Sequence, residues 1–180
     1  TYNENINFNG RNITVISESG RASTFIKGST TYNTNPVVTF SNSETSSAVL
    51  DGFTIDNNQT TSTSRGVYIS SSSPKIQNSI IENNTTNNQP GGGVYISGGS
   101  PSFINTIIRG NVSPNASGNC GGVYSTGASP SFDTCTIQNN SANNSTVGGG
   151  GIYIENGSAS ITNSTISSNS ATSRSGGGIY

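Results

Sequence analysis

The stretch GGGVYISGGSPSFINTIIRGN, residues 91–111, is followed by a near copy of itself, CGGVYSTGASPSFDTCTIQNN, residues 120–140. In both copies a glycine is followed directly by an apolar residue and a tyrosine. This three-residue motif occurs five times in the chain, and its glycine serves to align the repeats. The five glycines are Gly66, Gly93, Gly122, Gly151 and Gly178. Their spacings are 27, 29, 29 and 27 residues, so the chain is built from repeats of one short unit.

Aligning the repeats on this glycine produces columns of equivalent residues. One column is apolar and follows the glycine: Val67, Val94, Val123, Ile152 and Ile179. The next column is tyrosine: Tyr68, Tyr95, Tyr124, Tyr153 and Tyr180. Two more apolar columns come later, Ile76, Phe103, Phe132 and Ile161, and Ile81, Ile108, Ile137 and Ile166. Differences in repeat length fall after the end of these columns.

Each repeat contains three short stretches in which apolar and polar residues alternate, such as V-Y-I, S-F-I-N and T-I-I. Alternation with a period of two is typical of a strand with one buried face, and Gly, Pro, Asn and Ser separate the three stretches. The spacing of an amphipathic helix is missing. We therefore predict an all-β chain of three-strand coils, in which stacked coils form three parallel sheets around a narrow core of Val, Ile and Phe.

The whole chain, residues 1–180, is predicted to be a single solenoid domain. Residues 66–180 hold the regular repeats, and residues 1–65 hold degenerate N-terminal coils. The segment AVLDGFTIDNN, residues 48–58, copies the end of a repeat and puts Ile55 and Asn58 in the Ile and Asn columns. We expect about six to seven coils.

The composition fits such a thin, repeated core and excludes several classes of partner. Only 28% of the residues are hydrophobic and 8% are charged, and the net charge is −1. The polar content is neutral: 33 Ser, 22 Thr and 26 Asn. Without a basic excess we expect no nucleic-acid partner. No apolar run is long enough to span a membrane.

Candidate catalytic groups are sparse. There is no histidine, so no Ser-His-Asp or Cys-His arrangement can form within the chain. The best acidic cluster is an outward column of Asp56, Glu82 and Arg109, but the column continues as Gln138 and Ser167, which favours a surface charge ladder. The glycine runs lack the Lys-Ser/Thr and the helix of a phosphate-binding loop, and we place them at corners where glycine permits positive φ. We predict no enzyme activity, no catalytic residue, no metal site and no cofactor.

Two polar columns are the candidate functional and structural positions. In V-Y-I the Val and Ile point inward, so the tyrosine column is expected to form an exposed stacked stripe. Such a stripe either holds sugar rings or a protein surface, or only shields the sheet. The Asn column is expected to pass amide hydrogen bonds from coil to coil: Asn58, Asn84, Asn111, Asn140 and Asn169.

The two cysteines, Cys120 and Cys135, belong to one repeat and lie near different corners of its coil. A disulfide requires Cα atoms within about 7 Å. Two alternatives remain open: a bond across the coil, or free thiols with Cys135 buried.

The repeats resemble the right-handed parallel β-helix of the pectin-lyase-like superfold. The GGVY and GGIY starts resemble the GGA-I repeats of polymorphic outer-membrane proteins, and YNENINFNGRNITVISESG, residues 2–20, resembles the entry segment of bacterial surface proteins of that class. The resemblance implies a right-handed parallel β-helix. It says little about function, because this superfold includes lyases, hydrolases, adhesins and inert spacers.

We therefore expect a non-catalytic structural β-solenoid, located outside the cell or on its surface. No capping helix is evident at either end, so we expect head-to-tail self-association in a surface filament, or an adhesin role. A cut from a longer protein is the other explanation of the uncapped ends. The alternative function is a carbohydrate-binding or polysaccharide-degrading β-helix, with polysaccharide or the cell surface as partner.

Overall fold

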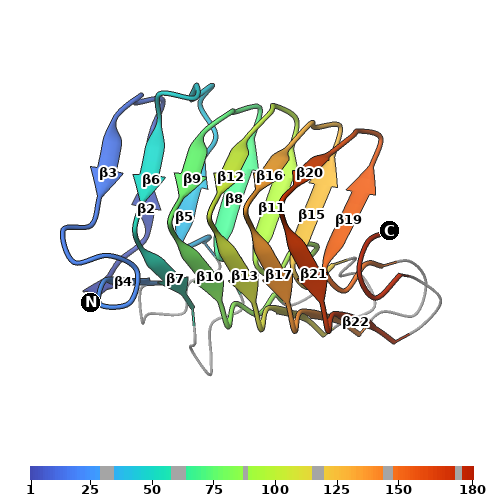
Figure 1. Cartoon of the computed structure of the whole chain (residues 1–180). Helices are drawn as coiled ribbons and strands as arrows, with labels where there is room; N and C mark the ends of the chain where they lie inside the picture. The colour runs from blue at the N-terminus through green and yellow to red at the C-terminus, as the bar shows by residue number, and fades with distance from the viewer. Residues whose placement is uncertain (29–34, 58–63, 87–88, 115–119, 144–147, 173–175) are drawn as a thin grey trace.

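The computed structural model of the chain is a stack of coils, and the residues that it describes form strands and turns without a helix (Figure 1). It describes residues 1–28, 35–57, 64–86, 89–114, 120–143, 148–172 and 176–180. Every strand pairing in this part of the chain is parallel and joins one coil to the next. Because strands from successive coils add to the same sheets, strands β1 to β7, which lie within residues 1–65, belong to the same stack as the regular repeats.

Three long sheets, A, B and C, form the sides of the stack. Sheet A consists of β1 (Tyr2–Asn3), β4 (Phe25–Lys27), β7 (Thr54–Asp56), β10 (Ile80–Glu82), β13 (Ile107–Arg109), β17 (Thr136–Gln138) and β21 (Thr165–Ser167). Sheet B consists of β2 (Ile6–Asn7), β5 (Val38–Phe40), β8 (Val67–Ser70), β11 (Val94–Ser97), β15 (Val123–Thr126) and β19 (Ile152–Glu155). Sheet C consists of β3 (Thr14–Ile16), β6 (Val49–Asp51), β9 (Lys75–Gln77), β12 (Ser102–Ile104), β16 (Ser131–Asp133) and β20 (Ser160–Thr162).

The register of these sheets reproduces the sequence columns. Val94 pairs with Val123 in sheet B, Phe103 with Phe132 in sheet C, and Ile108 with Ile137 in sheet A. The predicted fold class is therefore confirmed: an all-β parallel β-helix of three-strand coils with a repeat of 27–29 residues.

Two features differ from the prediction. The stack makes about five turns rather than six to seven, and the first step in sheet C is longer than the regular repeat, because Thr14 pairs with Val49, 35 residues later. A fourth, short sheet D also forms, directly after the Asn column, from β14 (Val112–Ser113), β18 (Ser141–Ala142) and β22 (Ser170–Ala171). The sequence alignment ended before these residues, so this sheet was not predicted.

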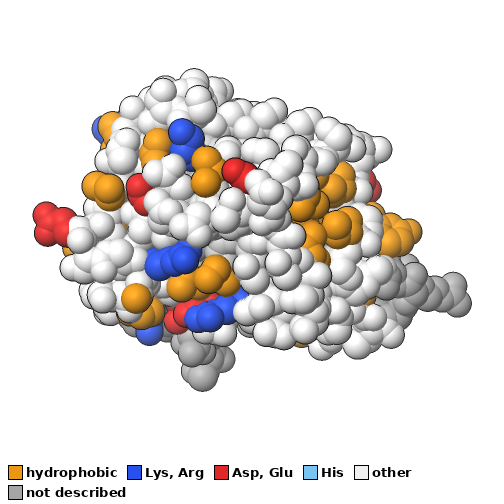
Figure 2. All heavy atoms as spheres, viewed as in Figure 1, with side chains coloured by type: hydrophobic (Ala, Val, Ile, Leu, Met, Phe, Trp, Pro, Cys, Tyr) orange, Lys and Arg blue, Asp and Glu red, His pale blue; other side chains and the backbone are white. Residues whose placement is uncertain are grey.

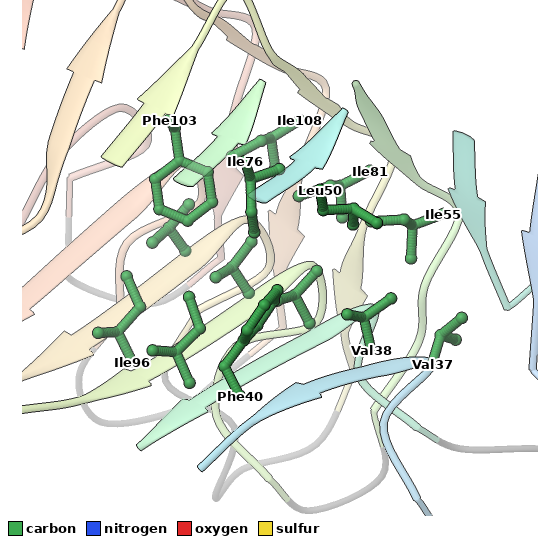
Figure 3. Packing of buried hydrophobic residues seen from close by; sticks show 14 of the residues in the cluster. Val37, Val38, Phe40, Leu50, Ile55, Ile76, Ile81, Ile96, Phe103 and Ile108 are labelled. Atoms are coloured by element: carbon green, nitrogen blue, oxygen red, sulfur yellow. The ribbon is translucent and has the colours of Figure 1, made fainter. Parts of the chain in front are cut away.

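The core is a narrow column of apolar side chains that runs along the axis of the stack (Figure 3). One continuous cluster extends from Phe8 to Ile152, and its central members are fully buried. Phe103 and Phe132 stack in consecutive coils with ring centroids 5.0 Å apart. Each coil alone leaves these side chains exposed, so the apolar contribution to stability arises from stacking.

The corner between sheets C and A requires a left-handed backbone conformation in every regular coil. The residues at this corner have positive φ values of 47–56°: Asn78, Asn105, Thr134 and Asn163. Asparagine tolerates this conformation better than most residues with a side chain, which explains why it occupies three of these four corner positions.

Glu44 is a buried carboxylate that ties three early coils together. It is 1% exposed and accepts hydrogen bonds from the backbone N–H groups of Gly10 (2.8 Å) and Asn42 (2.9 Å) and from the Ser72 hydroxyl (2.8 Å). Burial raises the pKa of this carboxyl group, but the three hydrogen bonds outweigh that effect and the pKa lies below its usual value. The ionised form is therefore the one that the fold stabilises.

This lowered pKa predicts a specific acid sensitivity. Because the folded-state pKa is below the unfolded value of about 4.3, the stabilisation is complete above that pH and is lost as the pH falls through the folded pKa. Glu44→Gln should cost about 1.5–3 kcal/mol at pH 7, the range for hydrogen bonds to a charged group. It should also weaken the pH dependence of stability between pH 5 and pH 3. Urea unfolding at pH 7, 5 and 3 measures both effects.

The control for this experiment is Glu18→Gln, which removes an exposed carboxylate. Its free energy of unfolding should stay within about 0.5 kcal/mol of the unmodified chain at each pH. If Glu44→Gln and Glu18→Gln show the same pH dependence, Glu44 has no special role.

Candidate functional site

The tyrosines of successive coils stack on the outer face of sheet B. Their rings are nearly parallel, with centroids 5.2–5.4 Å apart and interplanar angles of 3–11°. The stack contains Tyr68, Tyr95, Tyr124, Tyr153 and Tyr180. The structure thus brings all five predicted stripe residues together.

The expectation that the whole stripe is exposed is wrong. Tyr124 is 6% exposed and Tyr153 is 8% exposed, whereas Tyr180, at the end of the stack, is 53% exposed. Each inner ring is covered on both faces by its neighbours, and Cys120 packs against Tyr124 and Tyr153. The Tyr124 hydroxyl also donates a hydrogen bond to Glu155. Burial, followed by this carboxylate, raises the pKa of Tyr124.

Arg65 is a site residue that sequence reasoning missed. Its guanidinium carbon lies 4.5 Å from the ring centroid of Tyr95 and 5.6 Å from that of Tyr68, distances typical of cation–π contacts. Its Nε donates a hydrogen bond to the carbonyl of Pro90 (2.9 Å). The sequence marks Arg65 only as an exception within its column of the repeat alignment. The equivalent residue in the four later repeats is glycine: Gly92, Gly121, Gly150 and Gly177.

A hollow opens where the tyrosine stack ends on the N-terminal side. The register partner of Tyr68 in the preceding coil is Thr39, and that of Thr39 is Asn7, so the column loses its rings there. The hollow has a volume of about 520 Å3, and Tyr68, Arg65, Thr39 and Asn7 are among the residues that line it.

The asparagine column forms a hydrogen-bonded ladder inside the stack. The Asn111 Oδ1 accepts from both the backbone N–H (3.1 Å) and the Nδ2 (2.9 Å) of Asn84, and Asn140 does the same for Asn111. The Nδ2 of Asn111 also donates to the carbonyl of Ile81 (3.0 Å). Asn84, Asn111 and Asn140 are completely buried.

The two ends of the ladder differ from its centre. Asn169 accepts from Asn140 at 3.0 and 2.9 Å, but it is only half-buried because it belongs to the last coil. Asn58 lies outside the residues that the structure describes. In that coil Asn57 donates its backbone N–H to the Asn84 Oδ1 (2.9 Å) and so takes the ladder position one residue earlier than the alignment indicated.

The repeat glycines face this ladder, and close approach explains them better than positive φ. A Cβ atom on Gly93 would lie 2.8 Å from the Asn111 Nδ2 and 2.8 Å from the carbonyl oxygen of Gly122. Gly93 and Gly122 are not among the residues with positive φ, so the predicted reason is wrong for them. Glycine is needed because the backbone of one coil lies against the amide of the ladder.

The charged column on sheet A is an ordered ladder of opposite charges. Asp56 and Glu82 are register partners, and each has a cation on its other side. Lys27 Nζ lies 3.9 Å from Asp56 Oδ2, and Arg109 Nη2 lies 2.6 Å from Glu82 Oε2. Arg109 thus offsets Glu82, as the surface-ladder interpretation expected, and Lys27, which that interpretation did not include, pairs with Asp56.

The cysteines are both free and buried, so the alternative of a disulfide between Cys120 and Cys135 is not formed. Burial raises the pKa of the Cys120 thiol to about 12 and also raises that of Cys135. Both side chains are therefore thiols at neutral pH. Within the described ranges, no group of three or more His, Cys, Asp or Glu side chains is placed to hold a metal ion.

Comparison of the chain with protein-family models, with curated proteins and with solved structures gave no match. Among the residues described, no helix has the length and apolarity needed to cross a membrane.

The ladder predicts a large effect of one buried amide. Asn111→Ala removes the acceptor of two buried Asn84 donors, and each unsatisfied buried donor costs about 1–3 kcal/mol. We therefore expect a loss of about 2–4 kcal/mol in the free energy of unfolding, measured by urea denaturation.

Asn143→Ala is the matched control, because Asn143 is exposed and pairs with Ser113 only through its backbone N–H. It should change stability by less than about 0.5 kcal/mol. A loss at position 111 no larger than that at position 143 would show that the amide ladder does not hold the coils together.

Proposed function

We propose that the chain is a non-catalytic structural β-solenoid of the cell exterior that associates head to tail, as a subunit of a surface filament or adhesin. The observation that carries this proposal is the position of the exposed large hydrophobic side chains. In the part of the chain that the structure describes they all belong to the first or the last coil: Tyr2, Ile13, Ile16, Ile179 and Tyr180. Figure 2 shows hydrophobic side chains at both ends of the stack, whereas most charged side chains on this face lie over its N-terminal half.

The strand edges at the two ends are complementary. Each of the terminal strands β1, β2 and β3 has a neighbour on one side only, and so do β20 and β21. All strands of a sheet run in the same direction, so a second copy placed on the stack without rotation pairs β21 with β1 and β20 with β3. Unpaired strand edges of this kind are templates for further pairing.

The side chains at the two ends also continue the same columns. Ile166 belongs to the inward column that begins with Tyr2, and Ile161 belongs to the column that begins with Val15. The N-terminal end has a hollow of about 510 Å3 that reaches Ile26 and Phe53 in the core. Apolar side chains of a second copy would fill this hollow and bury the apolar surface that lines it.

The non-catalytic part of the proposal is supported by the pairing of the Asp56 and Glu82 carboxylates with Lys27 and Arg109. A location outside the cell is supported by the sparse charge, the absence of methionine and the abundance of Ser, Thr and Asn. A head-to-tail contact is heterologous and therefore extends into a filament unless the rotation closes a ring.

Assembly can be tested on the isolated chain. Sedimentation velocity and negative-stain microscopy at rising concentration should show species that grow in length at constant width. Ile16→Lys places a charge at the N-terminal end, at a position that is 63% exposed, and should leave the fold intact while it reduces assembly at least tenfold at a given concentration.

Ser100→Lys is the matched control, because it adds the same charge at an exposed position on the flank of the stack. It should assemble like the unmodified chain, and circular dichroism should confirm that both variants are folded. A chain that stays monomeric at its highest soluble concentration contradicts the proposal, as does equal assembly of the two variants.

A further inference from the structure

The hollow beside Tyr68 is an interruption in an otherwise regular outer surface. From Tyr180 to Tyr68 each coil contributes one ring to the stack, but the next coil contributes Thr39. Tyr68 is half-buried, and one face of its ring is covered by Tyr95 at a centroid distance of 5.4 Å. On its N-terminal side Tyr68 lines the hollow, and no described residue supplies a sixth ring there, because the register partner of Tyr68 is Thr39.

A saturated sugar ring matches this place in shape and in electrostatics. The face of an aromatic ring is negative, and the C–H groups on one face of a pyranose carry a partial positive charge. The volume of about 520 Å3 lies within the range of about 300–1,000 Å3 that small-molecule sites occupy. A pyranose stacked on Tyr68 would lie over Thr39, because one ring occupies one coil of the column.

The polar groups around the hollow favour an acidic sugar. Arg65 lies against the Tyr68 ring at the border of the hollow. Its Nε donates a hydrogen bond to the Pro90 carbonyl, and it takes part in neither of the ion pairs found in the described residues. None of the described residues that line the hollow carries a carboxylate. A guanidinium group binds a carboxylate through two parallel hydrogen bonds. The Asn7 amide and the Thr39 hydroxyl are hydrogen-bonding groups for the sugar hydroxyls.

We propose that this hollow binds an acidic pyranose residue of a polysaccharide, with its ring stacked on Tyr68 and its carboxylate held by Arg65. The site lies on the flank of the stack, and the experiment that tests it measures saccharide binding rather than assembly. Failure of one proposal therefore leaves the other intact.

Isothermal titration with tetragalacturonate and with its fully methyl-esterified form tests the site, because the two probes differ in charge but not in the sugar ring. The unmodified chain should bind the acidic probe at least tenfold more tightly than the ester. Tyr68→Ala should weaken binding of both probes at least tenfold. Arg65→Gln should weaken binding of the acid to the level of the ester and leave the ester unchanged.

Two further variants separate ligand binding from folding. Thr39→Tyr extends the tyrosine column by one ring, fills the hollow and should abolish binding while the circular dichroism spectrum stays unchanged. Tyr180→Ala removes the ring at the opposite end of the same stack and should bind like the unmodified chain.

Several outcomes overturn the proposal. They are an absence of binding to tetragalacturonate and to a glucuronate oligosaccharide at millimolar concentration, equal affinity of the unmodified chain for acid and ester, and binding that survives in folded Thr39→Tyr.

Discussion

Hydrogen bonding between buried asparagine amides in adjacent coils is the constraint on which the other features of this structure depend. Asn84, Asn111 and Asn140 are completely buried, so each amide must find protein partners. Those partners come from the coil before and the coil after. A coil that is removed from the stack therefore loses both its apolar contacts and the acceptors of its amides. The coils consequently depend on one another, as expected for a solenoid.

The ladder also determines the register and the sequence around it. A slip of one residue would turn every apolar column outward and leave the amides without partners. The backbone that lies against each amide must be glycine, because a Cβ atom on Gly93 would come within 2.8 Å of the Asn111 Nδ2. Outside the ladder the constraints are weaker. The outer face of sheet B therefore tolerates residues that differ from the repeat columns, such as Arg65 and Thr39. These two residues create the hollow for which we propose a ligand.

Much of the fold follows from the sequence, because the periodic columns report directly on the register. Val94, Phe103 and Ile108 were assigned inward from alternation alone, and the structure places them in the core. The features that were not predicted depend on the shape of individual coils. Asn57 donates to Asn84 one residue earlier than the alignment indicated, and Asn57 is not among the residues with positive φ, whereas the equivalent Asn83 in the next coil is. Tyr124 packs against Cys120, which is 4 residues away, and the equivalent position in the other repeats holds Ser64, Gly91, Gly149 or Gly176.

The candidate site was less accessible to sequence reasoning than the fold. A repeat alignment shows what the coils share, whereas the hollow arises from what two neighbouring coils lack: a ring at Thr39 in the coil of β5 and a glycine at Arg65 in the coil of β8. The stack of tyrosines was predicted, but its end at Tyr68 becomes a feature only when the register of β5 and β8 is known.

Amide hydrogen exchange of the asparagine side chains, followed by NMR, tests the central claim most directly. The Nδ2 protons of Asn84, Asn111 and Asn140 should exchange only through global unfolding, and their exchange should accelerate together when urea lowers the stability of the stack. The Nδ2 protons of Asn143, which is exposed, should exchange freely. Exchange of the Asn111 side chain as fast as that of Asn143, in a folded chain, would contradict a continuous buried ladder.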